Sequence, residues 1–227
     1  MASSESPVSL QQQGKVLIAT MDDGRANAVS VELSDALRGA IRQAENDPGI
    51  GALVIAGRAG RFSGGFDLSV IRGGDNAAIK RMVDGGGSLV LEAYAASVPV
   101  VAACTGHAVA AGALLLLGCD HRVGPDADVK IGLNEVAIGL TLPDWALAIA
   151  AERLSRRHLQ GAVANAQLFN GAGAVAAGFL DAVVEPDAVV AAAVERAAAL
   201  AELDPGAYAG TVKALRGPVL ARMAAGL

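Results

Sequence analysis

The stretch from Val98 to Glu135 constrains the fold of this chain most, because it predicts a strand, a turn and a helix in immediate succession. Val100 to Cys104 are apolar and include β-branched residues, which is typical of a buried strand. Small residues from Gly106 to Gly112 predict a turn, and Ala113 to Leu117 are apolar on every side, as in a buried helix. Such a turn directs free backbone N–H groups and the positive end of a helix dipole at one point. An anion or a developing oxyanion can bind there.

The same order of elements occurs once earlier in the chain. Ala52 to Ala56 predict a strand, and Phe62 to Leu68 predict a second turn of small residues that opens a short helix. Gly64 and Gly65 allow a close approach of the backbone, and Asp67 can cap the helix. Two such turns in one α/β chain can converge on a single oxygen atom.

Glu135 adds one acid to a segment that is otherwise apolar. An oxyanion site together with one carboxylate is typical of an enzyme that forms enolates. From the residues alone, a surface or helix-capping acid remains an alternative interpretation of Glu135, because acidic side chains are mostly exposed.

Composition and charge exclude several classes of protein. The chain has 227 residues, 53% of them hydrophobic, which is enough for one domain with a sizeable core. No apolar run reaches the roughly 18 residues of a membrane span, and the first residues, MASSESPVSLQQQ, do not resemble a signal peptide. The net charge is −5 and Lys and Arg form no long stripe, so nucleic acid is not an expected partner. We therefore expect a cytoplasmic protein with no membrane span.

The cysteine and histidine spacings do not indicate a metal site or a redox pair. Cys104 and Cys119 lie in apolar surroundings and have no CxxC partner, so we expect buried thiols in a reducing compartment. His121 and His158 lack the spacing of metal ligands.

The remaining pattern predicts further strands and helices along the chain. A strand is expected from Lys15 to Met21, and an amphipathic helix from Ser30 to about Asp47. A helix from Asn76 to Ser97 should be interrupted by the glycines at 85–87, which form either a hinge that gates a site or, as we favour, a loop between two helices. Later elements are a helix from Pro143, a strand at 180–184, and helices at 187–203 and 205–227.

Five segments, in order and spacing, resemble the motifs of the crotonase, or enoyl-CoA hydratase/isomerase, superfamily. Three of them are FSGGFDL at 62–68, CTGHAVAAGALLLLGCDHRV at 104–123 and GLNEVAIGLTLP at 132–143. The other two are RANA at 25–28 and AAGFLD at 176–181. The match covers residues from Lys15 to Val184 and is closest in motif to the Δ3,Δ2-enoyl-CoA isomerases.

The resemblance implies an α/β fold, a crotonase-like spiral of ββα units. Residues 1–184 would form the core with the active site, and residues 185–227 a C-terminal helical region that serves oligomerisation. The implied substrate is an acyl-CoA thioester of fatty-acid metabolism, and the implied assembly is a homotrimer or a dimer of trimers. No permanently bound cofactor is expected, because coenzyme A enters as part of the substrate.

The resemblance also implies which residues form the site. The two oxyanion N–H groups would belong to Phe66 and Ala111. Ala110 and Ala111 replace two of the three glycines of the family's pattern, which is tolerable only if both φ angles are negative. The residues that would contact the substrate are Arg25, Ala26, Phe66, Asp67, Leu68, Ala111 and Trp145.

The acidic residues separate the reactions of the superfamily. Its hydratases carry two glutamates, and the positions that correspond here are Leu114 and Glu135. Adding water needs a base and an acid, whereas moving a double bond from C3 to C2 needs one base that takes a C2 proton and returns it at C4. We therefore expect a Δ3,Δ2-enoyl-CoA isomerase with Glu135 as its single acid/base, whose pKa is raised by apolar neighbours.

Alternatives remain open for the function and for several residues. The chain could be an enoyl-CoA hydratase in which Asp144 replaces the missing acid, or a non-catalytic acyl-CoA-binding or scaffold protein. Asp67 is expected to cap a helix rather than to catalyse, and His107 to be structural. Phe66 and Trp145 could wall an acyl pocket or simply pack in the core.

Overall fold

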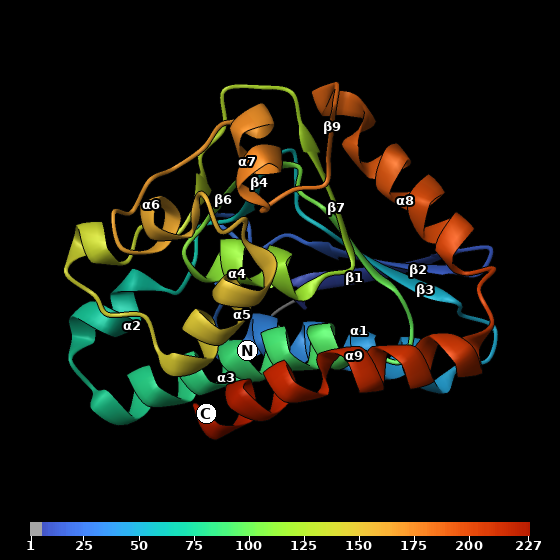
Figure 1. Cartoon of the computed structure of the whole chain (residues 1–227), viewed down its shortest axis with the longest axis horizontal. Helices are drawn as coiled ribbons and strands as arrows, with labels where there is room; N and C mark the ends of the chain where they lie inside the picture. Colours follow the sequence, from blue (N-terminus) through green and yellow to red (C-terminus); the bar gives the residue numbers. More distant parts are fainter. Residues whose placement is uncertain (1–5) are drawn as a thin grey trace, which may run out of the picture.

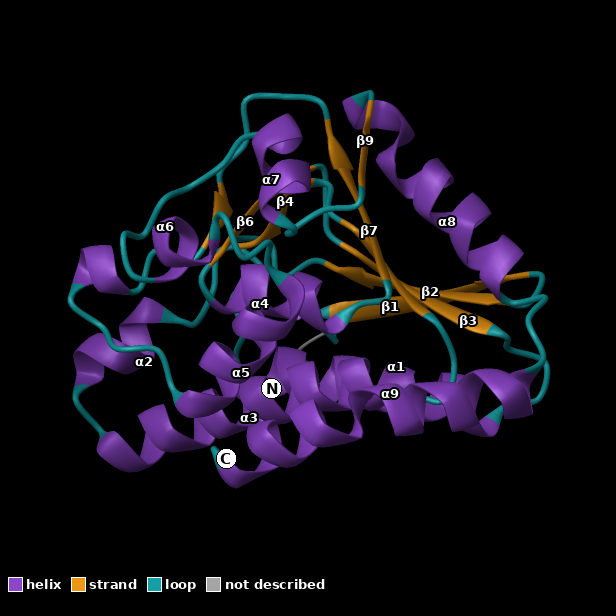
Figure 2. Ribbon diagram, viewed as in Figure 1, coloured by secondary structure: helices purple, strands orange, loops and turns teal. Residues whose placement is uncertain are grey.

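The computed structural model describes residues 6–227, which form two β-sheets surrounded by helices (Figures 1 and 2). Within the large sheet, as described from residue 6 onwards, β1 and β2 pair antiparallel and the other neighbouring strands pair parallel. The large sheet has the order β1 (Val8–Gln13), β2 (Val16–Met21), β3 (Ala52–Ala56), β5 (Val100–Ala103), β7 (His121–Pro125) and β9 (Ala182–Val184). The small sheet has the order β4 (Gly60–Ser63), β6 (Gly106–Val109) and β8 (Ile131–Gly132).

Successive strands alternate between the two sheets, which produces a spiral of ββα units. β3, β5 and β7 lie in the large sheet, and the strand that follows each of them, β4, β6 or β8, lies in the small sheet. The helices that follow the three pairs are α2 (Leu68–Gly73) with α3 (Asn76–Ala95), then α4 (Ala111–Gly118), and finally the 3-10 turn η1 (Val136–Ile138) with α5 (Asp144–Arg153). The expected fold class is therefore confirmed.

The large sheet separates two apolar cores, and its strands β2, β3 and β5 contribute alternate residues to them. In β3, Leu53 and Ile55 enter the core under α1 (Val31–Asn46), α3 and α4, while Val54 enters the core under α8 (Val189–Leu200). This alternation follows from the two-residue period of a strand. The remaining helical segments are α6 (Leu159–Val163), α7 (Gly171–Ala177), η2 (Pro186–Ala188) and α9 (Pro205–Ala225).

Helix α4 lies at the centre of the molecule, and all eight of its residues are buried (Figure 1). The sequence predicts the position of this helix correctly, but its prediction for the segment that precedes the helix is wrong. Gly106–Val109 is strand β6 and not part of a turn, because these residues pair with β4 on one side and β8 on the other. The turn is confined to Ala110, and the helix begins at Ala111.

The expected interruption of the helix at residues 85–87 is wrong, since α3 continues through all three glycines. Two of them are positions where another segment comes too close for a side chain. A Cβ built on Gly86 would lie 2.6 Å from the Phe66 ring, and one built on Gly87 would lie 2.8 Å from the Trp145 indole. The packing of these aromatic rings therefore offsets the cost of glycine in a helix, which is roughly 1 kcal/mol for each residue.

The C-terminal helix α9 packs on α3 and α5 of its own chain. A buried polar cluster fastens it. The Arg216 guanidinium pairs with Asp120 and lies 4.5 Å from the centre of the Tyr94 ring, and the Tyr208 hydroxyl donates to Asp120 at 2.9 Å. The C-terminal helix therefore packs on the body of its own chain, whereas the expected role of this region in oligomerisation stays a prediction.

Two further expectations concern the thiols and the membrane. Cys104 and Cys119 are free and buried, and burial raises the pKa of each thiol to about 12. Both therefore behave as apolar core residues. In the part of the chain from residue 6 onwards, no helix has the length and apolar character to cross a membrane.

Candidate active site

The first turn of the site is anchored by Asn27, a fully buried residue with a positive φ of 49°. Its side-chain amide donates to the carbonyls of Met21 at 3.0 Å and Phe62 at 3.1 Å, and its Oδ1 accepts from the Asp23 N–H at 3.0 Å. These bonds join the end of β2 to the end of β4. The short loop at residues 25–28 is thereby fixed beside the glycines that follow β4.

Ser63 and Val29 complete the anchoring of this turn. The Ser63 hydroxyl donates to the Asn27 carbonyl at 2.7 Å and accepts from the Gly65 N–H at 3.2 Å. The Val29 N–H donates to the Gly65 carbonyl at 2.8 Å. Gly65 has a φ of +88°, which favours glycine. The peptide that leads into Phe66 is therefore held from both sides.

The second turn lies directly against the first. A Cβ built on Gly65 would lie 2.8 Å from the Ala110 Cβ and 3.4 Å from the Ala111 nitrogen. A Cβ built on Gly112 would lie 2.6 Å from the Ser63 Cβ. The two turns that the sequence predicts to converge are thus in contact, and within residues 6–227 neither the Phe66 nor the Ala111 N–H donates a hydrogen bond.

Ala110 corrects one expectation about the backbone. Its φ is +52° and its ψ −127°, so the requirement for a negative φ fails at this position, although it is met at Ala111. The Ala110 N–H is bound to the Gly132 carbonyl at 3.0 Å, and α4 begins at the next residue. The chain must therefore reverse within one residue, and the alanine accepts a conformation that glycine would adopt without strain.

Glu135 lies three residues after Gly132, the partner of Ala110, at the start of η1. Its side chain is buried, at 8% exposure, and its Oε2 has no hydrogen-bond partner among residues 6–227. Burial raises the pKa of its carboxyl, and hydrogen bonds from the Glu135 and Asn134 backbone offset this only in part. The position of the second hydratase acid, Leu114, is 1% exposed and lies in the apolar core.

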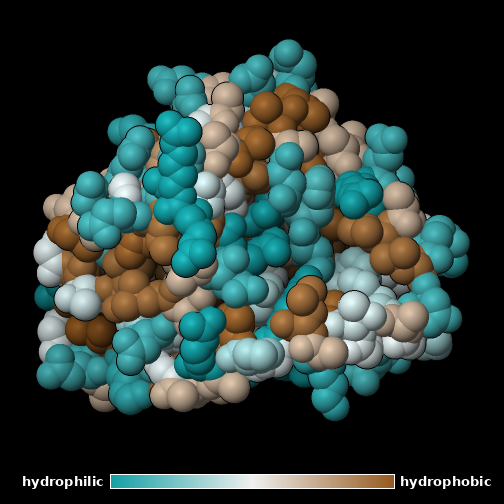
Figure 3. All heavy atoms as spheres, viewed as in Figure 1, coloured by the Kyte–Doolittle hydropathy of each residue, from teal (hydrophilic) through white to brown (hydrophobic). Residues whose placement is uncertain are grey.

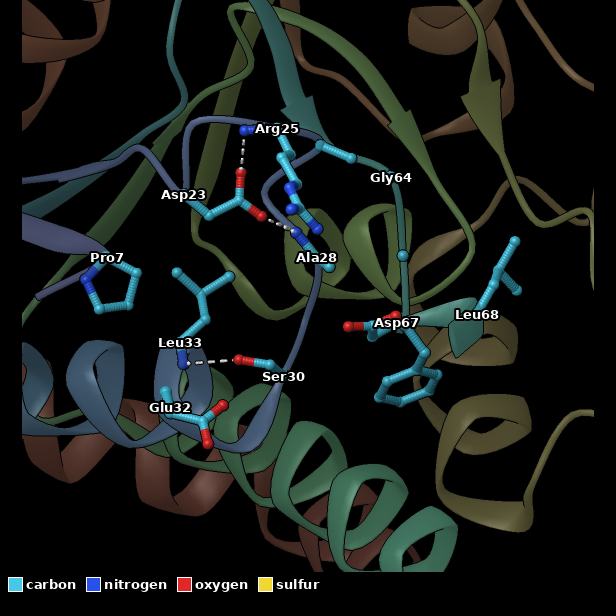
Figure 4. Close-up of a pocket in the computed structure, with 13 residues that line it drawn as sticks. Pro7, Asp23, Arg25, Ala28, Ser30, Glu32, Leu33, Gly64, Asp67 and Leu68 are labelled. Carbon is cyan, nitrogen blue, oxygen red and sulfur yellow. Dashed lines mark hydrogen bonds between the residues drawn. The ribbon is translucent and has the colours of Figure 1, made fainter. Parts of the chain in front are cut away.

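A cavity of ≈ 610 Å³ opens beside the first turn (Figure 4). Of the residues expected to contact substrate, it is lined by Arg25, Ala26, Phe66, Asp67 and Leu68, but not by Ala111 or Trp145; Glu135 is also absent from its lining. The other charged residues in its lining are Asp23 and Glu32.

Asp23 stabilises the loop that forms one wall of this cavity. Burial alone would raise the pKa of the Asp23 carboxyl, but backbone N–H groups of Asn27, Ala28 and Arg25, with the charge of Arg58, outweigh it and lower the pKa. Figure 4 shows this carboxylate turned toward the Arg25 and Ala28 N–H groups, to which it bonds at 2.7 and 2.9 Å. Asp23 is therefore a structural anion.

Comparison with known proteins identifies the family. Residues 11–226 match the family model described as enoyl-CoA hydratase/isomerase. The chain belongs to this family. It is 30% identical over 186 residues to the mitochondrial enoyl-CoA delta isomerase 1 of Rattus norvegicus. This match covers 80% of the present chain but only 64% of that relative. It spans 48% of a probable enoyl-CoA hydratase of Mycobacterium tuberculosis to which it is 39% identical.

Solved structures of enoyl-CoA hydratase/isomerase family members have the same fold. A probable enoyl-CoA hydratase of Mycobacterium tuberculosis superposes with a TM-score of 0.93 at 42% identity, covering 97% of this chain and 92% of that one. A second structure of that same protein, this time called an enoyl-CoA isomerase, superposes with a TM-score of 0.90 at 41% identity, covering 97% of this chain and 96% of that one. This one relative is thus named for either reaction, so its names do not decide between the two reactions.

The remaining residues that the sequence singles out are Asp67, His107, Asp144 and Trp145, and the structure gives the contacts or exposure of each. Asp67 caps α2 by accepting from the Ser69 N–H at 2.8 Å, and His107 Nδ1 accepts from the Lys130 N–H at 2.9 Å. Asp144 is exposed on the first turn of α5. Trp145 is 1% exposed and packs against Gly87, so its contact with substrate stays a prediction.

Sequence reasoning missed three residues that shape the first turn. Val29 and Ser63 bond to Gly65, and Gly86 lies under the Phe66 ring. Nothing in the local pattern singles out Val29 or Ser63, because their roles depend on segments that are distant in the chain. The glycine run at 85–87 was a signal, but it indicated close packing and not a break in the helix.

Proposed function

We propose that this protein isomerises 3-enoyl-CoA to 2-enoyl-CoA, with Glu135 as its single acid/base. The observation that carries this proposal is the buried, unpartnered carboxylate oxygen of Glu135, together with a hydrocarbon side chain at Leu114. An unpaired polar atom in a protein interior costs free energy and calls for a functional explanation. A carboxylate that takes and returns a proton is such an explanation, and it favours an enzyme over a scaffold.

The two free N–H groups would bind the thioester oxygen of the substrate. In the proposed step, Glu135 removes a proton from C2, negative charge moves onto the thioester oxygen, and a dienolate forms. The Phe66 and Ala111 N–H groups stabilise this oxyanion, and the Ala111 group also carries the positive end of the α4 dipole. The C3–C4 double bond becomes C2–C3 when Glu135 returns the proton at C4.

The raised pKa of Glu135 supports both halves of this step. A base with a very low pKa would return the proton poorly, whereas burial brings the carboxyl nearer to the pH at which it works. Hydration would instead need an activated water and a separate proton donor. Leu114 supplies neither, and the exposed Asp144 is the residue that the alternative, an enoyl-CoA hydratase, would have to use.

The coenzyme A part of the substrate would occupy the ≈ 610 Å³ cavity. Its walls from Ala26 and Leu68 can contact the pantetheine chain, and Arg25 is the cation in its lining that can meet a phosphate group. Because Asp23, Glu32 and Asp67 also line the cavity, we expect Arg25 to be needed to offset their negative charge.

An exposed apolar surface follows Glu135 and supports the expected association of subunits. Val136, Ile138, Leu140 and Leu147 are 36–50% exposed, and apolar side chains gather on the left of the face in Figure 3. Exposed apolar groups of this kind mark interaction surfaces. Sedimentation at micromolar concentration tests the association, and a monomer alone would contradict it.

The reaction is tested by offering 3-enoyl-CoA and 2-enoyl-CoA separately and following the products by mass. Wild type should isomerise the first and hydrate the second slowly. Glu135→Gln keeps the shape but cannot accept the proton, so isomerisation should fall by about 10²–10⁴-fold. Rapid hydration of 2-enoyl-CoA with no turnover of 3-enoyl-CoA would replace this proposal by the hydratase alternative.

A further inference from the structure

The peptide between Gly65 and Phe66 is oriented by its carbonyl group. The Val29 N–H donates to the Gly65 carbonyl at 2.8 Å, and Val29 and Phe66 pair as a short parallel bridge. In a planar trans peptide the C=O and N–H bonds point in opposite directions. The bond from Val29 therefore also fixes the direction of the Phe66 N–H, the first of the two free donors.

The side chains of the same two residues rest on a single backbone position in α3. A Cβ built on Gly86 would lie 2.6 Å from Phe66 Cε1, 2.9 Å from Phe66 Cζ and 3.3 Å from Val29 Cγ1. Gly86 is buried, so any side chain there must displace the ring, Val29 or the helix. The first two of these movements act on the two residues whose pairing holds the Gly65–Phe66 peptide.

We propose that Gly86 is a positioning residue for the first oxyanion donor, acting through Val29 and Phe66. The proposal rests on the proposed function, since it takes the Phe66 N–H as a donor to the thioester oxygen. Gly86 does not line the cavity beside the first turn. It sets the distance between α3 and the turn, and so the position of the Phe66 amide relative to that of Ala111.

The neighbouring glycines provide matched controls on the same helix. A Cβ built on Gly85 would meet nothing within 4 Å. One built on Gly87 would meet Leu227 and Trp145, which belong to the C-terminal side of the core, and not Phe66. A substitution at Gly85 therefore tests the helix alone, one at Gly87 tests packing in the core, and one at Gly86 tests the contact with the turn.

The test compares Gly85→Ala, Gly86→Ala and Gly87→Ala with wild type, using whichever enoyl-CoA the enzyme converts. Gly86→Ala should lower kcat about tenfold or more with little change in KM, since a 1 Å misplacement can cost roughly 10²-fold. Gly85→Ala should keep wild-type kcat and raise Tm. Gly87→Ala should lower Tm while kcat falls far less than in Gly86→Ala.

A second substitution distinguishes positioning from general damage. Phe66→Leu removes the Cε1 and Cζ atoms that the new methyl group would meet, yet it keeps the amide. In the Gly86→Ala background it should restore kcat several-fold. A merely structural role of Gly86 would not produce this rescue.

Ligand binding supplies a readout that does not depend on the reaction. A 3-oxoacyl-CoA can bind as its enolate, whose oxygen resembles the oxyanion, whereas a saturated acyl-CoA cannot. Gly86→Ala should weaken the first far more than the second, whether the enzyme is an isomerase or a hydratase. Failure of the proposed function would show separately, as full turnover in Glu135→Gln.

Wild-type kcat in a folded Gly86→Ala protein would overturn the proposal. An equal loss in Gly87→Ala without rescue by Phe66→Leu would also overturn it. If Gly86→Ala does not fold, Phe66→Leu alone tests the same contact, because the peptide then loses the ring that anchors it. Its kcat and its preference for 3-oxoacyl-CoA should both fall, and an unchanged preference would contradict the proposal.

Discussion

The two turns that meet at the site follow adjacent strands of the small sheet, but they are held in different ways. The turn after β4 is fixed by side chains in addition to the backbone bond from Val29, since Asn27 and Ser63 bond to its backbone and Asp67 caps the helix that follows it. The turn after β6 is fixed by backbone alone, through the bond from the Ala110 N–H to the Gly132 carbonyl. Helix α4 has no side-chain cap.

This difference determines what each turn can offer to a ligand. A carboxylate cap takes up N–H groups and opposes the dipole of a helix, so the six-residue α2 offers little positive potential to a ligand. The uncapped and buried start of α4 keeps the Ala111 N–H and the helix dipole available. Under the proposed function, we therefore expect the first turn to contribute a rigidly oriented amide and the second to contribute the stronger electrostatic stabilisation.

Within this comparison of the two turns, the largest expected effect comes from removing the donor of the second turn. Ala111→Pro deletes the N–H at the first position of α4, where proline fits a helix. Turnover should fall by on the order of 10²–10³-fold, as for the loss of one oxyanion donor. Steady-state kinetics on the converted enoyl-CoA measure this loss.

The control for this variant is Ala111→Gly, which keeps the N–H and should have a mild effect. Circular dichroism and thermal melting establish that both proteins are folded. Near-normal turnover in a folded Ala111→Pro protein would break the comparison, because the uncapped helix would then contribute no more than the capped one.

A smaller effect concerns Glu135, the acid that follows the strand bonded to the second turn. Its pKa is raised by burial from the ordinary value of 4.5, so the folded protein holds its proton to a higher pH than the unfolded chain does. Its favourable contribution to stability is complete below about pH 4.5 and is lost as pH rises through the raised pKa. Above this raised pKa, the buried charge therefore lowers the free energy of unfolding.

Glu135→Gln should consequently stabilise the protein above this window and have little effect below it. The gain should be on the order of 1–3 kcal/mol, the usual cost of an unsatisfied buried polar group. Urea unfolding of both proteins between about pH 4 and pH 8 measures this difference in the free energy of unfolding. The pH range at which the difference appears shows where the Glu135 carboxyl titrates in the folded protein. A difference that is constant with pH would show that the carboxylate is not strained by burial.

Much of the molecule could be predicted because the deciding signals are local. Three features can be predicted from neighbouring residues alone, and the structure contains all of them. They are the strand before Gly106, the uniformly apolar helix α4 and the Ser30 cap of α1. The order of the motifs predicts the family and its fold, and the family match confirms this prediction. The resemblance implies the two N–H donors and the acid, and within the described chain the Phe66 and Ala111 N–H groups and the Glu135 Oε2 have no hydrogen-bond partner.

The failures of prediction all lie where distant segments meet. Strand β6 is too short to show a period, and it exists because β4 and β8 pair with it. The glycines of α3 wrongly predict a break in the helix, because intrinsic propensity counts only the cost of glycine and not the aromatic rings that need the space. Ala110 adopts a positive φ because the chain must pass from β6 into α4 within one residue.

The smallest expected effect tests whether this strained alanine is merely tolerated. Ala110 has the dihedrals of the first central residue of a type II′ turn, a position dominated by glycine. Strain of this kind costs about 1–3 kcal/mol, and glycine loses roughly 0.5–1 kcal/mol more backbone entropy on folding. Ala110→Gly should therefore stabilise the protein by about 1 kcal/mol in urea unfolding, with turnover nearly unchanged. The alanine methyl group faces Gly65, where a second Cβ would lie 2.8 Å away. If Ala110→Gly instead lowers both stability and turnover, this methyl group is the contact that couples the backbone-held turn to the one held by side chains.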